Sequence, residues 1–477
     1  MTQALGIGAS SVNADMTAID ALAQNIANAQ TPGYLSESAN LSAVPGGSQL
    51  GVGSGVEVTS IVQATNALLS ANNWQAQGAL SNLSALQETL SAVENVFPLA
   101  GRPSGSTTSA STSSSIAGQL STFWSSWDAI AANPSSQAPR VEVLNGAQAL
   151  VTSLHEAATQ LAQITHNATA DLTGQVQQVN TLLAQVATLN QAIVKTSSSG
   201  STTAPLEDQL QASLGTLSQL AGVDVRMQAN GTATVSIGGM AVVQQATAST
   251  LEVTSASTPA SSTKTPPLSV ELKMSTGAGL AVPVSSGSIA GLLTSVNTSI
   301  PKANAMLNEV AAALSTTVNG ELKTGYAATG APAGSTPSHW QMLVGAPTAA
   351  GIAVNAAMLA TPSRIAVSAT NATTGKAAAN NGGVAQAMAE LGTTPVGPDA
   401  KYQTLVQSMG AMAQSVNNQM DAQTAVATQA KQAMQAVTGV NLTADLTSLL
   451  SFQQNYEASA KVLTTVDSAV QALLQAV

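Results

Sequence analysis

Few side chains in this sequence have the type and spacing that chemistry requires. The histidines, His155, His166 and His339, lie far apart, and none falls in a metal-ligating spacing such as H-E-x-x-H. Paired carboxylates could serve a glycosidase, but Glu207 and Asp208 are adjacent in a stretch with helical character, which favours a solvated face. We therefore expect no catalytic residue, no cofactor site and no metal site.

The composition excludes further classes. The 477 residues carry a net charge of −10, and the 13 basic residues form no cluster, so we expect no nucleic-acid partner and no membrane partner. An aromatic content of 2% leaves few anchors for a thick core and favours long helices packed through small residues. There is no cysteine, no secretory signal pattern and no run of 18 apolar residues, so an export route without a cleaved signal is expected if the protein leaves the cytosol.

The two chain ends carry the clearest positional pattern. Near the N-terminus, apolar residues alternate spacings of four and three: Leu5, Ala9, Val12, Met16, Ile19, Ala23 and Ile26. Near the C-terminus, a second row does the same with one interruption: Leu449, Phe452, Tyr456, Ser459, Leu463, Val466, Val470, Leu473 and Val477. Such rows are typical of coiled-coil seams, and each helix would pair with the other or with a neighbouring subunit. The alternative is two unrelated amphipathic helices on local cores.

The first of these helices ends at a marked turn, Thr31-Pro32-Gly33-Tyr34. Asn25 and Asn28 lie off the apolar row, and we expect them to contact other subunits.

Between the ends, the periodicity is mostly helical. We expect helices over about 64–97, from 116 to Pro134, and over 140–195, 289–319 and 402–477; residues 41–60 read as loops with a short extended piece. Alternating residues with Asn-Gly and Gly-Gly turns predict strands over 222–285. The fold class is thus mainly α with an inserted β module (α+β, multidomain). The expected domains are a terminal coiled-coil domain (1–35 with 437–477), a helical domain (36–221 with 286–436) and the β domain (222–285).

Both chain ends resemble the signatures of bacterial flagellar axial proteins, the family of rod, hook and hook-associated proteins. The N-terminal match lies in QNIANAQTPGY and is carried by Asn25, Ile26, Ala27, Asn28, Thr31, Pro32, Gly33 and Tyr34. The C-terminal match lies in residues 439–474 and is carried by Gly439, Val440, Asn441, Leu442, Leu449, Gln453, Tyr456, Ala458, Ala460, Lys461 and Val462. Where the family carries charges, this chain has neutral amides at Gln63 and Asn66.

Three internal stretches, 120–151, 179–193 and 206–239, resemble the hook-associated members of this family, whereas hook and distal rod proteins lack these helices. The resemblance implies a structural subunit that is exported unfolded by the flagellar type III system. It would join hook to filament as a ring of identical copies, extracellularly, and be needed for filament assembly.

The implied partners are further copies of the chain, the hook protein, a second junction protein or the flagellin side of the filament, and an export chaperone at the C-terminal helix. The alternatives are another axial subunit (hook or distal rod), a flagellum-associated peptidoglycan hydrolase, and a surface adhesin rich in small residues.

Overall fold

The structure is a computed structural model of the chain. It describes residues 2–31, 34–45, 53–98, 115–199, 202–255, 266–273, 279–327, 340–369 and 381–475. The low-complexity stretch 101–114, which is rich in serine and threonine, and His339 therefore lie outside the described residues.

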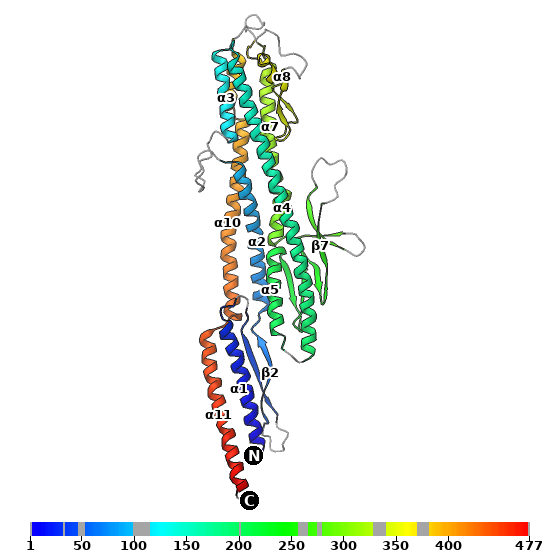
Figure 1. Ribbon diagram of the computed structural model, residues 1–477, viewed down its shortest axis with the longest axis vertical. Coiled ribbons are helices and arrows are strands. Elements are labelled where there is room, and N and C mark those ends of the chain that lie inside the picture. The colour runs from blue at the N-terminus through cyan, green and yellow to red at the C-terminus, as the bar shows by residue number, and fades with distance from the viewer. Residues whose placement is uncertain are drawn as a thin grey trace.

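Long helices form an extended body (Figure 1). The main ones are α2 (Ala67–Val96), α4 (Ala138–Ser198), α5 (Ala204–Ala221), α7 (Ile300–Lys323) and α10 (Pro398–Thr438). The 61 residues of α4 bury a regular apolar row from Val143 to Ile193 and so form the spine of the body. On α2, Leu90 packs with Ala413 and Val416 of α10, and the small residues on α10 allow the two helices to lie close together.

Shorter elements complete the end of the body farthest from the chain termini (Figure 1). They are α3 (Ile116–Ala132), α8 (Ala356–Ala360), α9 (Gly383–Glu390) and the hairpin of β10 (Leu343–Gly345) and β11 (Ile352–Val354). Farther along the body, α6 (Gly287–Thr294) continues through a π turn, Ser295–Ser299, into α7. Phe123 and Trp127 on α3 are buried against α4, with ring centroids 6.2 Å apart.

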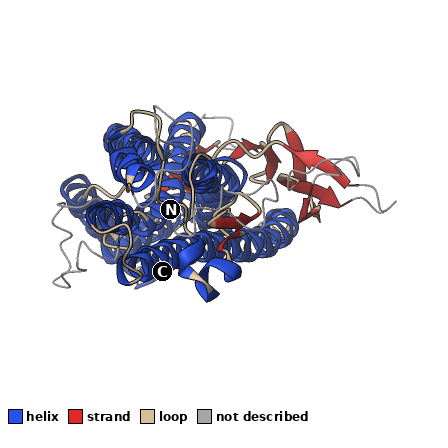
Figure 2. Ribbon diagram, turned by 90° about the horizontal axis from the view of Figure 1, so that it is seen from above, coloured by secondary structure: helices blue, strands red, loops and turns tan. Residues whose placement is uncertain are grey.

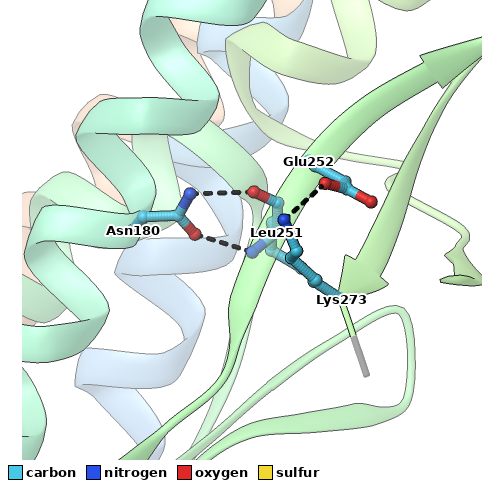
Figure 3. A network of polar contacts seen from close by, with 4 residues as sticks. All are labelled: Asn180, Leu251, Glu252 and Lys273. Atoms are coloured by element: carbon cyan, nitrogen blue, oxygen red, sulfur yellow. Dashed lines mark hydrogen bonds and ion pairs between the residues drawn. The ribbon is translucent and has the colours of Figure 1, made fainter. Parts of the chain in front are cut away.

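Two small antiparallel sheets lie against one side of the helices (Figure 2). One has the order β3-β4-β5-β6, from strands Val223–Met227, Ala233–Ile237, Met240–Gln244 and Thr247–Ala248. The other has the order β7-β8-β9, from strands Thr250–Ser255, Leu268–Lys273 and Gly279–Val282. Asn180 on α4 fixes β7 by accepting from the Leu251 N–H and donating to its carbonyl, both at 2.8 Å (Figure 3).

At the end of the body near both termini, three elements form a separate group, which we call the terminal module. It contains α1 (Thr2–Asn28), the hairpin of β1 (Glu37–Val44) and β2 (Gly55–Gln63), and α11 (Leu442–Gln475). Helices α1 and α11 run antiparallel, so the two chain ends lie at the same tip (Figure 1). The mainly α fold with small antiparallel sheets, expected from the sequence, is confirmed.

The hairpin corrects part of one prediction: residues 41–44, expected to be loop, belong to β1, whereas the short extended piece expected in residues 41–60 corresponds to β2. Eight residue pairs join β1 to β2 from Glu37–Gln63 to Val44–Gly55, with a register shift after Asn40. Most of its side chains remain exposed or half-buried, so the apolar alternation that normally marks a strand is weak here. The hairpin packs along α1, which supplies the third element that an isolated hairpin needs for stability.

Candidate functional site: the terminal helices and their joint

The seam between α1 and α11 is built from small and polar residues. On α1, Gly8 and Ser11 contact α11, and the buried residues Asp15, Ala18, Leu22 and Asn25 continue the same face at the three–four spacing of a heptad. A Cβ added at Gly8 would lie 3.0 Å from Leu463, and the hydroxyls of Ser11 and Ser459 lie 2.9 Å apart. Small residues therefore let the two helices approach closely, and burial raises the pKa of Asp15 on this face.

The predicted apolar row of α1 lies one residue around the helix from this seam. Leu5 and Met16 are 44% and 48% exposed, and Val12, Ile19 and Ile26 are half-buried. The predicted row contains the most apolar side chains of α1, whereas the residues of α1 that contact α11 are mostly small. The row therefore does not join the two helices of one chain, and it stays partly uncovered in the single copy.

The predicted C-terminal row lies on the side of α11 that faces α1. Leu449, Phe452, Leu463, Val466 and Val470 are half-buried there. Tyr456 is 36% exposed, and nothing is described of the Leu473 side chain. Other signature residues point outward: Leu442 is 42% exposed, and Gln453 and Lys461 are exposed.

Asn25 is the hub that ties α1 to the hairpin. Its Oδ1 accepts from the Glu37 N–H at 2.8 Å and from the Tyr34 hydroxyl at 2.9 Å. Its Nδ2 donates to the Glu37 carbonyl at 2.8 Å and to the Ser36 hydroxyl at 3.3 Å. Because Asn25 is 0% exposed, it cannot make the contact between subunits that the sequence predicted, and its role lies within the chain.

The remaining signature residues near this hub shape helix ends. Asn28 donates to the Gln24 carbonyl at 3.0 Å and accepts from the Thr31 hydroxyl at 3.2 Å, so its bonds are local. Pro32 and Gly33 lie outside the described residues. At the start of α11, Asn441 accepts from the Ala444 N–H at 3.2 Å, as a helix cap does.

A polar joint connects the terminal module to the body. Gln63, at the end of β2, donates to the Asp208 carboxylate at 2.9 Å and to the Ala204 carbonyl at 3.1 Å on α5. The Ser36 N–H donates to the Thr438 carbonyl at the end of α10, 2.9 Å away. Among the residues that the structure describes, no ion pair crosses this joint, since both ion pairs formed by those residues lie in the body.

The joint gathers acidic groups, and among the described residues none of these groups forms an ion pair. Burial raises the pKa of Asp208 to about 6; the hydrogen bond from Gln63 opposes this shift, and repulsion from Glu37 and Glu207 adds to it. Burial, followed by repulsion from Glu37, Asp208 and Asp445, raises the pKa of Tyr34. At neutral pH the Asp208 carboxyl is therefore mostly ionised, although its surroundings in the folded chain favour the protonated form.

Sequence reasoning missed the small-residue seam and the joint residues Gln63 and Asp208. A signal for the seam was present, since Gly8, Ser11 and Ala18 keep heptad spacing one position before the apolar row. No local signal marked the contact between Gln63 and Asp208, because the two residues lie 145 positions apart.

The groups considered for chemistry form no reactive site in the described part of the chain. His155 bonds the Ile352 carbonyl at 2.7 Å, and Glu207 accepts from the Thr203 hydroxyl at 2.7 Å. No cluster of three or more His, Asp or Glu with metal-binding geometry occurs among the described residues. None of the helices described there is long and apolar enough to cross a bilayer.

Comparison with known protein families places this architecture. The family described as "Flagellar hook-associated protein FlgK helical domain" matches residues 106–336, and "Flagellar basal body rod FlgEFG protein C-terminal" matches residues 431–476. The first match spans α3 to α7 with the β module between them, and the second spans the end of α10 and α11.

Individual proteins agree with these matches. Flagellar hook-associated protein 1 of Escherichia coli is 25% identical over 340 residues, which cover 69% of this chain and 59% of that protein. The Salmonella typhimurium protein of the same name is 26% identical over 340 residues, covering 69% and 58%. The flagellar hook junction protein FlgK from Burkholderia pseudomallei has a similar fold, with a TM-score of 0.63 at 18% identity over 78% of this chain and 100% of that one.

Fold and family matches together define a component of the bacterial flagellum, an axial protein with paired terminal helices. Within that class, the chain matches the helical domain of the hook-associated protein FlgK over residues 106–336 and is similar to flagellar hook-associated protein 1. The matched region spans somewhat less than three fifths of the length of its curated relatives.

Proposed function

We propose that this protein is a non-catalytic structural subunit that joins hook to filament as a ring of identical copies. The observation that carries the proposal is the uncovered apolar row on α1, beside a seam that already pairs α1 with α11. Met16 and Leu5 on this row would be covered by the terminal module of a neighbouring copy, which removes their apolar surface from water.

The proposal divides the chain into three working parts. The terminal module lines the inside of the ring, the long helices contact neighbouring copies around it, and the two sheets of residues 223–282 project outward. The position of the sheets on one side of the body supports the last assignment (Figure 2).

The proposal also includes export and partners. The chain would leave the cell unfolded through the flagellar type III apparatus, with an export chaperone on the C-terminal helix. It would then contact the hook protein on one side, and a second junction protein or flagellin on the other. The loosely packed α11, none of whose described residues is fully buried, supports a helix that orders only on assembly.

The helical block at α3 and α4 favours this position over a hook or distal rod subunit, because the FlgK helical-domain match includes it. No observation in the described residues favours a peptidoglycan hydrolase, whose two carboxylates would need a substrate cleft between them.

Deleting the gene tests the proposal. Electron microscopy of the deletion strain should show hooks without filaments, and flagellin should accumulate in the medium. A plasmid copy of the gene should restore filaments. Filaments of normal length and number in the deletion strain would contradict the proposed role.

A further inference from the structure

Two clefts flank Trp74 where the terminal module meets the body. The larger, of about 560 Å³, lies between the end of α1, α2, α5 and α10. The smaller, of about 370 Å³, lies between α2, α5 and the turn that joins β3 to β4. Ser70, Trp74 and Gln211 line both, so the clefts adjoin across these three residues.

The walls of the larger cleft are rich in side-chain amides. Six of the residues that supply them are Gln30, Asn73, Gln77, Gln211, Gln219 and Gln435. Asn73 is only 9% exposed, and its Oδ1 has no hydrogen-bond partner among the residues that the structure describes. A buried acceptor of this kind is costly to leave unpaired, so a ligand that brings N–H donors would suit this wall of the cleft.

Elsewhere in the chain, side-chain amides bind extended backbone in a repeated way. Asn25, Asn180, Asn297 and Asn381 each contact both the N–H and the carbonyl of a single residue: Glu37, Leu251, Leu268 and Ala369, respectively. The Asn180 pair is seen in Figure 3. A side-chain amide can donate to a backbone carbonyl and accept from a backbone N–H at the same time. Extended polypeptide is therefore the class of ligand that the amide-rich walls of the cleft could bind.

We propose that the clefts beside Trp74 receive an extended segment of a second copy of this chain. The inference rests on the proposed function, and it adds a receptor site to the apolar row. The larger cleft opens beside Asn28 and Thr31 at the end of α1, the helix on which Met16 and Ile26 lie partly uncovered.

Charge supports the same occupant. Lys431 is exposed on the rim of the larger cleft, and in the described part of the chain no carboxylate forms an ion pair with it. A copy of a chain with net charge −10 offers many carboxylates to this lysine.

Filling the cleft tests the site. Gly215 on α5 lines it, and an added Cβ there would meet only Trp74, at 3.6 Å, so a larger side chain at this position would occupy cleft space. Gly174→Leu is the matched control, because a Cβ on that exposed α4 glycine meets nothing within 4 Å. Both purified variants should keep the circular dichroism spectrum of the wild type.

In a strain that lacks the chromosomal gene, flagella isolated with Gly215→Leu should retain at least about tenfold less of the chain than wild type, and Gly174→Leu should match wild type. Wild-type retention of Gly215→Leu would overturn the inference and leave the proposed function standing. Absence of the wild-type chain from isolated flagella would overturn the proposed function, and this inference with it.

Carbodiimide coupling identifies the occupant, since it joins a lysine amine to a contacting carboxylate. In isolated flagella, the wild-type chain should form covalent dimers whose linked peptide contains Lys431. Lys431→Arg keeps the positive charge but removes the amine, so these dimers should disappear. Dimers that persist in Lys431→Arg, or links from Lys431 only to other flagellar proteins, would overturn the assignment.

Discussion

At the scale of single residues, Asn25 carries the attachment of the hairpin. Asn25→Ala would leave the N–H and carbonyl of Glu37 and the hydroxyl of Tyr34 without the partners that they now have. We expect a loss of about 2–3 kcal/mol in the stability of the terminal module, since each buried unpaired group costs about 1–3 kcal/mol. Hydrogen exchange of the β1 amides measures it. Asn28→Ala, which breaks only local bonds, is the control, and equal exchange in both variants would refute the role of Asn25.

Asp208 gives the joint a pH dependence. Its pKa in the folded chain, about 6, lies above the ordinary value of 3.8. A raised folded pKa means that the folded state binds the proton more tightly. The stability that Asp208 contributes is therefore fully present below about pH 4, and it is lost as the pH rises through about 6.

Asp208→Asn should remove this dependence. The variant should melt at a higher temperature than wild type at pH 7.5, and the difference should shrink as the pH falls from 6 to 4. Thermal unfolding followed over that range measures it. If the difference in melting temperature between Asp208→Asn and wild type stays constant with pH, the pKa of Asp208 is not raised in the folded chain.

At the scale of elements, the spacing of the seam depends on Gly8. Gly8→Leu introduces a side chain whose Cβ alone would lie 3.0 Å from Leu463, and overpacking of this kind costs about 1–3 kcal/mol. Amides of α11 should then exchange faster. Gly6→Ala, with nothing within 4 Å, should slow exchange slightly or leave it unchanged, because alanine favours helix. If the α11 amides exchange at the same rate in Gly8→Leu and in wild type, α11 does not pack against Gly8.

Some of these elements and contacts could be predicted from the sequence, and others could not. Helices such as α2 and α4 were predictable because their apolar rows recur at helical spacing over many turns, as Leu83, Leu86 and Leu90 do. The face of α1 that contacts α11 could not be predicted in this way. Hydrophobicity favours Met16 over Gly8 as a contact residue, whereas close packing of the two helices favours Gly8. The contact between Gln63 and Asp208 could not be predicted from the sequence, because the two residues are far apart in the chain and only the tertiary fold brings them together.

At the scale of the whole molecule, charge opposes assembly of the terminal modules. Residues 1–63 and 439–477 carry seven carboxylates and one lysine, a net side-chain charge of −6. Identical copies packed in a ring repel one another, and salt screens that repulsion. Lowering the ionic strength should therefore release the chain from isolated flagella. The double variant Asp20→Asn and Glu457→Gln, which alters two exposed carboxylates, should resist release. Greater retention at low salt would contradict this.

In the proposed ring, the apolar row of α1 faces a second copy of the chain. Site-specific photo-crosslinking in assembled flagella tests it, with the crosslinking residue in place of Met16 or, as a control, of the buried Ala18 in the seam with α11. Position 16 should give covalent dimers of the chain, whereas position 18 should give only links within one chain, to α11. Links from position 16 that stay within one chain, or that reach only other flagellar proteins, would contradict it.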